Sequence, residues 1–161
     1  MMNTLPTIKA DLIKGMDERR DKARTFVETV SPDLHVHKDT DWTAKDLITH
    51  LTAFEEDMIE AIQTFMDGGT YRLDIRGQTT IDEFNEVRRQ EQASITWEQA
   101  LQQWETVRDQ LRGVIIAFPE NQLDTPFSTP FLVKYNLLQA VKGCGAHEKL
   151  HINEMKSASN S

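Results

Sequence analysis

Apolar residues recur every three or four positions along most of this chain, the spacing that places them on one face of an α-helix. The pattern predicts four long amphipathic helices and one short helix. The predicted ranges are about 7–30, 44–67, 97–118 and 136–157 for the long helices and about 81–93 for the short one. Because apolar and polar residues nowhere alternate for long enough to indicate a strand, the predicted fold class is all-α, an up-down four-helix bundle with one extra short helix.

Residues that start or stop helices mark the predicted boundaries. Thr43, Thr80 and Thr96 each stand three residues before an acidic or amide side chain, which is the spacing of an N-terminal capping box. Gly68 follows the second long helix and Pro119 follows the third, as expected of residues that interrupt helical hydrogen bonding. The segments between the helices are predicted to be loops, and the longest is the proline-rich stretch before the last helix.

The composition restricts the classes of partner and the location. The 161 residues suit one domain, 1–161, and Asp plus Glu outnumber Lys plus Arg by 26 to 18, a net charge of −8. Such an acidic chain has no electrostatic reason to bind nucleic acid or an anionic membrane. No apolar run is long enough to span a bilayer, and the N-terminus lacks the basic and apolar segments of a secretory signal. Because the single cysteine, Cys144, has no internal disulfide partner, we expect a reducing compartment, the cytoplasm.

Three of the five histidines, His50, His147 and His151, interrupt apolar stripes, where a neutral imidazole needs hydrogen-bond partners or a metal. His147 and His151 are one turn apart, so both rings leave the same helix face and can share one ion. His50 lies roughly 9 Å from the start of its helix, and His151 lies roughly 9 Å from the end of the last helix. If these two helices run antiparallel, the three histidines lie at one level and can form one metal site.

The last two of these histidines belong to a His-Glu-x-x-His motif, which is typical of zinc metalloproteases. A metalloprotease needs a further ligand after the motif, for example in the pattern H-E-x-x-H-x-x-G-x-x-H. Here the positions for Gly and His are Glu154 and Ser157, and only ten residues follow His151. The protease interpretation therefore fails. Glu148 points about 100° away from His147 around the helix and is interpreted as incidental to the site.

Other polar residues are weaker candidates. Glu154 has the position of a fourth ligand or of a hydrogen-bond acceptor for a ligating histidine, but a solvated charge near the helix end is the favoured interpretation. Cys144 could line the site, although a small buried apolar role is favoured. His35 and His37 form an H-x-H pair, for which a solvated loop is favoured over a second metal site. Asp57 is a candidate base, although its acidic neighbours favour an ordinary acidic surface.

Two segments carry a resemblance to a known family. The spacing Trp42-x7-His50 in WTAKDLITHLTAFEED, followed by His147-x3-His151, resembles the DinB/YfiT-like superfamily of four-helix metal-binding proteins. The segment IDEFNEVRRQEQASITWEQALQQWETVRDQL is similar to its central helical region, so the resemblance covers essentially the whole chain. It implies that His50, His147 and His151 bind a divalent metal, zinc or nickel above all, with coordination positions open for water or substrate. Dimers recur in this family, so the resemblance also implies a homodimer.

The same family includes thiol-dependent transferases and isomerases, such as mycothiol-dependent maleylpyruvate isomerase and bacillithiol S-transferases. The resemblance therefore implies a metal-dependent enzyme that uses a low-molecular-weight thiol against a small electrophile, since a bound metal lowers the pKa of a thiol. Two alternatives stay open. One is a metal-independent hydrolase of the ClbS/DfsB type, which the loop YRLDIRGQTTIDEFN resembles. The other is a non-catalytic, stress-related binding protein whose metal site is absent or closed. No residue is assigned as a catalytic acid or base.

Overall fold

The computed structural model describes residues 4–161, so the first three residues of the predicted domain lie outside the described part. Five helices account for most of it. They are α1 (Thr4–Val27), α2 (Ala44–Met66), α3 (Ile81–Glu91), α4 (Trp97–Ala117) and α5 (Leu137–Ser159), and a 3₁₀ turn covers Glu120–Gln122. These elements confirm the predicted all-α bundle of four long helices with one extra short helix.

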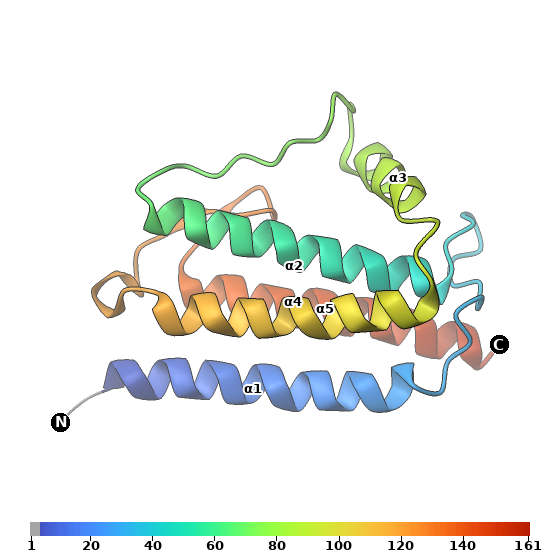
Figure 1. Ribbon diagram of the computed structural model, residues 1–161, viewed down its shortest axis with the longest axis horizontal. Helices are drawn as coiled ribbons and strands as arrows, with labels where there is room; N and C mark the ends of the chain where they lie inside the picture. Colours follow the sequence, from blue (N-terminus) through green and yellow to red (C-terminus); the bar gives the residue numbers. More distant parts are fainter. Residues whose placement is uncertain (1–3) are drawn as a thin grey trace.

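The helices α1 and α5 run in one direction along the bundle, and α2 and α4 run in the other (Figure 1). The segment 67–96, which contains α3, travels back along the length of the bundle, so α4 begins at the same end as α2. The up-down description thus holds for α1 with α2 and for α4 with α5, whereas α2 and α4 are parallel and form the most extensively packed pair. For the histidines the important result is that α2 and α5 are antiparallel.

Local sequence explains where four of the helices begin. Thr43, Thr80, Thr96 and Asn136 are N-caps with complete capping boxes. In each box the cap side chain accepts a hydrogen bond from the backbone N–H three residues later, and that residue's side chain accepts one from the backbone of the cap. The helix ends differ from the predicted ones by less than one turn, and the largest difference is in α1, which was predicted over 7–30.

The expectation that the chain contains no strand is wrong for one short segment. Phe127–Ser128 (β1) and Lys134–Tyr135 (β2) pair as an antiparallel hairpin before α5. Two-residue strands are too short to leave an alternating signal in the sequence. The turn of the hairpin contains Leu132 with a positive φ of 64°, and the ring of Phe131 packs against that of Phe54 on α2, with 4.8 Å between the ring centroids.

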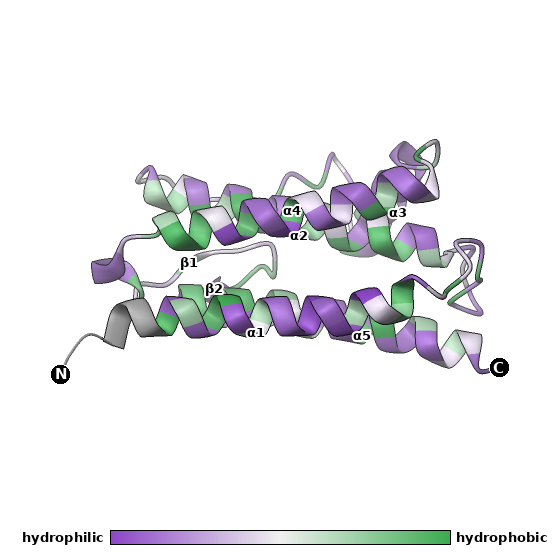
Figure 2. Ribbon diagram, turned by 60° about the horizontal axis from the view of Figure 1, so that its bottom comes forward, coloured by the Kyte–Doolittle hydropathy of each residue, from purple (hydrophilic) through white to green (hydrophobic). Residues whose placement is uncertain are grey.

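The apolar core is divided into two clusters, one toward each end of the bundle. One cluster includes Met16 and Leu111, and the other includes Leu47 and Met155. Figure 2 shows that apolar residues form broken bands along each helix rather than one continuous stretch. Consistent with these bands, none of the described helices combines the length and the apolar character needed to cross a membrane.

Four buried charges separate the two apolar clusters, and we call them the charge quartet. Arg20 on α1, Glu55 on α2, Arg108 on α4 and Glu148 on α5 each expose 4% of their surface or less. Along every long helix the charged residue lies between members of the two clusters. Glu55 is one of the acidic neighbours of Asp57 that favoured an ordinary acidic surface, and this placement corrects that interpretation because its carboxylate lies inside the bundle.

Each carboxylate of the charge quartet contacts both guanidinium groups. Arg20 Nε donates to Glu148 at 3.0 Å, and Arg20 Nη2 donates to Glu55 at 3.4 Å. Arg108 Nε donates to Glu55 at 3.2 Å, and Arg108 Nη2 donates to Glu148 at 3.4 Å. Trp104 adds an indole N–H bond to Glu148 at 3.1 Å and lies under the Arg20 guanidinium, whose carbon is 3.9 Å from the ring centroid. Within the described residues no buried side-chain polar atom lacks a hydrogen-bond partner, which is the condition that makes buried charges tolerable.

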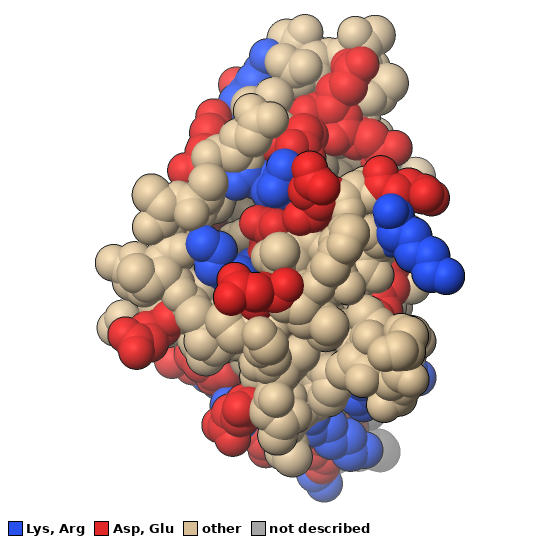
Figure 3. All heavy atoms as spheres, turned by 90° about the vertical axis from the view of Figure 1, so that its right-hand side faces the viewer, with Lys and Arg blue, Asp and Glu red and all other residues tan. Residues whose placement is uncertain are grey.

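Charges of both signs mix on the surface at the end of the bundle where α2 begins and α5 ends. Figure 3 shows several groups of acidic side chains on this face, interspersed with separate basic ones. Partly exposed ion pairs such as that of Arg24 with Glu105, 2.7 Å apart, contribute little to stability because water screens them. The excess of acidic residues is thus visible on this face, which presents no continuous basic surface.

Replacing Arg108 with Met is expected to lower the free energy of unfolding by about 3–5 kcal/mol, because the substitution leaves two buried carboxylates to share one guanidinium. The matched control is Arg112→Met, which removes a more exposed arginine paired with Asp17 and should cost less than about 1 kcal/mol. Urea unfolding followed by circular dichroism measures both. Equal effects of the two substitutions would contradict the structural role assigned to the quartet.

Candidate metal centre

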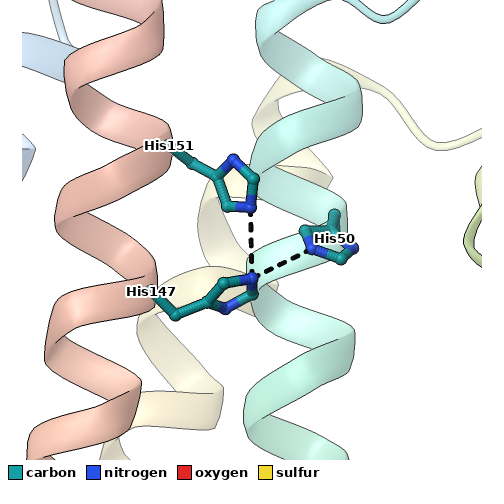
Figure 4. Close-up of side chains that lie close together, drawn as sticks. All are labelled: His50, His147 and His151. Carbon is teal, nitrogen blue, oxygen red and sulfur yellow. Dashed lines mark hydrogen bonds between the residues drawn. The ribbon is translucent and has the colours of Figure 1, made fainter. Parts of the chain in front are cut away.

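His50 from α2 and His147 and His151 from α5 turn their rings toward one another (Figure 4). The Nε2 atom of His147 lies 3.2 Å from Nε2 of His50 and 3.1 Å from Nε2 of His151. One potential ligand atom of each ring lies within 4.8 Å of the other two. The structure therefore brings the three predicted residues to one level, as the helix-length argument requires. We call them the histidine cluster.

The histidine cluster has the donor set and the spacing of a metal site. Two imidazole nitrogens bound to one zinc ion at about 2.0–2.1 Å lie roughly 3.3–3.4 Å apart in tetrahedral geometry. The separations of 3.1 and 3.2 Å from His147 Nε2 to its two neighbours are close to that value. Within the described residues no carboxylate or cysteine joins the three histidines as a fourth ligand. Three protein ligands with one position free is the arrangement of catalytic zinc sites, whereas structural sites are closed.

Burial keeps two of these imidazoles neutral. Desolvation, to which the neighbouring histidines add, lowers the pKa of His50 from 6.5 to about 2 and that of His147 from 6.5 to about 4. A neutral imidazole is the form that binds a metal through a ring nitrogen. At neutral pH these two side chains are therefore in the ligand form already.

Glu154 fixes the orientation of His151. Nδ1 of His151 lies 2.9 Å from the Glu154 carboxylate, so its N–H donates there and leaves Nε2 directed at the cluster. His37 from the loop between α1 and α2 donates to the same carboxylate oxygen from Nε2 at 2.8 Å. Although partial burial acts to raise it, the hydrogen bonds from both histidines hold the pKa of Glu154 below its usual value.

These contacts correct the interpretation of Glu154, which is not simply a solvated charge near the helix end, because it accepts hydrogen bonds from two histidines. In the loop, His35 is exposed, as the solvated-loop interpretation expects, and bonds the carbonyl of Thr40. His37 departs from that interpretation because it is half-buried and reaches Glu154. A contact between side chains 117 positions apart leaves no spacing signal that could have predicted it.

Aromatic side chains pack on two of the histidine rings. The Trp42 ring stands edge-on to His50, with 5.6 Å between the ring centroids, and Phe54 lies 4.4 Å from His147 in the same measure. The indole N–H of Trp42 donates to Glu86 on α3 at 3.0 Å. Trp42 therefore links the loop, the histidine cluster and α3.

The glutamate of the His-Glu-x-x-His motif is not incidental. Glu148 points away from the histidine cluster, as predicted, but it belongs to the charge quartet and is held by Arg20, Arg108 and Trp104. Its neighbour His147 faces α2 on another side of the same helix. In this motif Glu148 holds α5 against the other helices through its ion pairs, while the two histidines are candidate metal ligands. The motif therefore matches that of a protease in residue types, but its glutamate has a structural role.

Among the cavities lined by described residues, two of appreciable volume reach the histidine cluster. The first has a volume of about 170 Å³ and lies between α2, α3 and the hairpin. We call it the aromatic cavity, because Phe54, Phe84 and Phe131 line it together with His50 and His147. The remaining lining residues are Asp57, Leu73, Ile81, Asn85, Arg88 and Pro130.

The second cavity has a volume of about 330 Å³ and reaches His50 and His151. It is lined in addition by His37, Thr40, Trp42, Leu47, Asp82, Asn85 and Glu86. Both cavities receive residues from α3, and none of these was a candidate from the sequence. Their role depends on how α3 lies over α2, which apolar periodicity within α3 does not indicate.

The remaining candidates have clear positions. Asp57 lines the aromatic cavity and pairs with Arg88 at 2.5 Å, so it does not belong to an ordinary acidic surface. Burial raises the pKa of Asp57 even with that partner beside it. Cys144 is buried in the core cluster, as favoured from the sequence, and burial raises the pKa of its thiol, so it is not a ready thiolate.

Comparison with known proteins identifies the family and supports the fold. The profile of the DinB superfamily matches residues 12–155. The solved structure of the colibactin self-resistance protein ClbS in complex with a dsDNA is similar with a TM-score of 0.75 at 16% identity, covering 95% of this chain and 96% of that one. A protein of Clostridium difficile 630 gives a TM-score of 0.77 at 10% identity, covering 94% and 95%. An uncharacterised protein of Escherichia coli UTI89 gives 0.72 at 14% identity, covering 94% and 92%. Among curated proteins, comparison by sequence finds no match.

The pKa shifts predict how the metal-free protein responds to acid. Because His50 and His147 bind protons less readily when folded than when unfolded, the free energy of unfolding should fall as the pH drops below about 6.5. The part due to His147 levels off near pH 4, while that due to His50 continues toward pH 2. By pH 5 each of the two lowered pKa values should cost about 2 kcal/mol of unfolding free energy.

Other groups also titrate in this pH range, so the contribution of His50 to the pH dependence of stability must be separated from theirs. The variant His50→Gln does this because it removes only that imidazole. Its loss of stability between pH 7 and pH 5, measured by urea unfolding in the presence of a chelator, should be smaller than that of the parent. A loss as large as the parent's would show that His50 is not a buried neutral imidazole.

Proposed function

The chain belongs to the DinB superfamily, and on that basis we propose that it is a divalent-metal-dependent enzyme, a thiol-dependent transferase or isomerase that acts on a small electrophile. The proposed metal ligands are His50, His147 and His151, and zinc or nickel suits these imidazole donors. A divalent metal held there would act as a Lewis acid and lower the pKa of a thiol or water bound beside it.

One observation carries this proposal: three ring nitrogens from two antiparallel helices converge without a fourth protein ligand among the described residues, next to cavities that reach the same rings. A purely structural metal site would be closed by protein ligands. Three separately satisfied core histidines would bond to other groups, whereas here the Nε2 atom of His147 lies within hydrogen-bonding distance of the Nε2 atoms of both other histidines.

The residues around the cluster have defined roles in this proposal. Glu154 orients His151 by accepting its Nδ1–H, and Trp42 and Phe54 limit the movement of the other two rings. The aromatic cavity offers a mainly apolar wall for the apolar part of a substrate, while the second cavity offers hydrogen-bonding side chains for a hydrophilic thiol. No side chain is assigned as the general acid or base.

We propose a small molecule rather than nucleic acid as the substrate. The similar structure of ClbS contains dsDNA, but this chain has a net charge of −8 and no continuous basic surface on the face shown in Figure 3. A second candidate function is the alternative that the sequence left open, a hydrolase of the ClbS/DfsB type that works without metal. The two candidates differ in what a chelator does to activity.

Metal content tests the site itself. Purified protein without a tag, incubated with zinc or nickel and desalted, should contain about one metal ion per chain by inductively coupled plasma mass spectrometry. His50→Ala should contain little, whereas the matched control His35→Ala, which removes a histidine outside the cluster, should equal the parent. Absence of metal from the parent under these conditions would sink the metal proposal.

Activity tests the chemistry. The metal-loaded parent should accelerate the reaction of cysteine or 2-mercaptoethanol with a nitroaromatic halide, and the acceleration should disappear on chelation and in His50→Ala. Hydrolysis of an amide or ester that survives chelation would instead support the metal-independent hydrolase. Stoichiometric metal without either activity would favour a binding protein.

Substituting Glu154 with Gln is expected to weaken metal binding by about 10–100-fold, because His151 loses the carboxylate that fixes its ring orientation. Competition with a chelating dye measures the affinity. Glu28→Gln, which removes an exposed carboxylate outside the site, is the matched control and should behave as the parent. An unchanged affinity in Glu154→Gln would mean that the carboxylate has no role in holding the ligand.

A further inference from the structure

Arg88 is the one arginine or lysine among the residues that line the aromatic cavity, and its contacts indicate which chemical group it can bind. Arg88 on α3 lines the cavity together with the three phenylalanines and two of the cluster histidines. Its guanidinium carbon lies 4.9 Å from the centroid of the Phe84 ring. Only 16% of the Arg88 side chain is exposed, so a positive charge is held in a mainly apolar pocket with little access to water.

Most of the hydrogen-bonding capacity of Arg88 is unused within the described residues. Its Nη1 donates to Asp57 at 2.5 Å, and this is the only hydrogen bond that its side chain makes there. A guanidinium has five N–H donors. Because no fully buried polar atom of the described side chains lacks a partner, the other nitrogens of Arg88 are accessible. A planar fork of free donors at the wall of a cavity is suited to a carboxylate, which it can bind through two parallel bonds.

Asp57 already pairs with the Arg88 guanidinium, so the carboxylate of a ligand would compete with it for this cation. Its side chain is 18% exposed, and the ion pair with Arg88 leaves the cavity without net charge from these two residues. Burial outweighs Arg88 and raises the pKa of Asp57, so its ionised form is held at a cost. A second carboxylate arriving with a ligand would find a guanidinium that is only partly engaged.

The walls limit the shape of the ligand. The volume of about 170 Å³ is below the range of about 300–1,000 Å³ typical of drug-sized ligands. Phe131 can lie this close to α5 because position 143 is glycine: a Cβ there would come within 2.7 Å of the Phe131 ring. The ring centroids of Phe54 and Phe131 are 4.8 Å apart. Because aromatic rings form part of the wall, the pocket is suited to a small, flat, apolar group.

We propose that the aromatic cavity binds a small, flat, apolar substrate that carries a carboxylate, and that Arg88 pairs with this carboxylate while the rest of the molecule extends toward His50 and His147. This inference rests on the proposed function, since it names the class of electrophile for the same site. Arg88 is a substrate-binding residue in this proposal and takes no part in the chemical step.

Binding of simple probes tests the proposal without any catalytic readout. Benzoate has the ring and the carboxylate, benzamide has the ring without the charge, and acetate has the charge without the ring. Isothermal titration calorimetry on metal-free and zinc-loaded protein should give one saturable site for benzoate. Benzamide and acetate should each bind at least about tenfold more weakly. Equal affinity for benzoate and benzamide would overturn the assignment of Arg88.

Two substitutions with opposite expected effects protect the test against misfolding. Arg88→Gln should weaken benzoate binding by about tenfold or more, whereas Asp57→Asn should strengthen it, because the competing carboxylate is gone. Arg76→Gln is the control, since Arg76 pairs with the exposed Glu91 and does not line the cavity. No change in Arg88→Gln, or weaker binding in Asp57→Asn, would contradict the proposal.

The outcomes separate this inference from the proposed function. Benzoate binding that depends on Arg88 in a protein that takes up no metal would support the carboxylate site and overturn the metal site. Stoichiometric metal bound by the three histidines, together with no saturable benzoate binding, would support the metal site and overturn the carboxylate site.

Discussion

The charge quartet is the constraint on which the rest of the structure depends. Two arginines and two glutamates lose their hydration inside the bundle, and this loss is offset only while all four remain together. Because each long helix contributes one member, sliding or rotating any helix would separate an ion pair in a medium of low polarity. Apolar side chains tolerate small shifts in packing, whereas these paired charges do not. The quartet thereby selects one register for the four helices.

That register also determines the geometry of the histidine cluster. Glu148 and His147 are neighbours on α5, about 100° apart around the helix, and Glu55 follows His50 on α2 by five residues, or about 140°. On each of these helices one face carries a glutamate of the quartet, and another face carries the histidines of the cluster. The same two helices are therefore aligned by an ionic contact close to the point where their histidines meet, and the spacing of the rings does not depend on the histidines alone.

The sequence was sufficient for those features that arise within one helix. Periodicity and capping boxes located all five helices, and helix length predicted the three histidines at one level on the condition that their two helices are antiparallel. It was insufficient wherever a contact joins distant segments. Arg20 and Glu148 look like any surface charges until the bundle is assembled, and their pairing across 128 positions has no periodic signature. The bond from His37 to Glu154 and the place of Arg88 in a cavity depend on how the α1–α2 loop and α3 lie over α2 and α5.

The parallel arrangement of α2 and α4 requires segment 67–96 to travel back over the length of the bundle, and this segment forms much of the wall of both cavities. Only Tyr71 and Phe84 within it are buried, so it contributes little to the core. Changes in the sequence or length of segment 67–96 are expected to alter the shape and charge of the two cavities with little effect on the stability of the four long helices. Evolution can thus vary the recognition of ligands separately from folding, and the frame itself persists in solved structures that share only 10% identity with this chain.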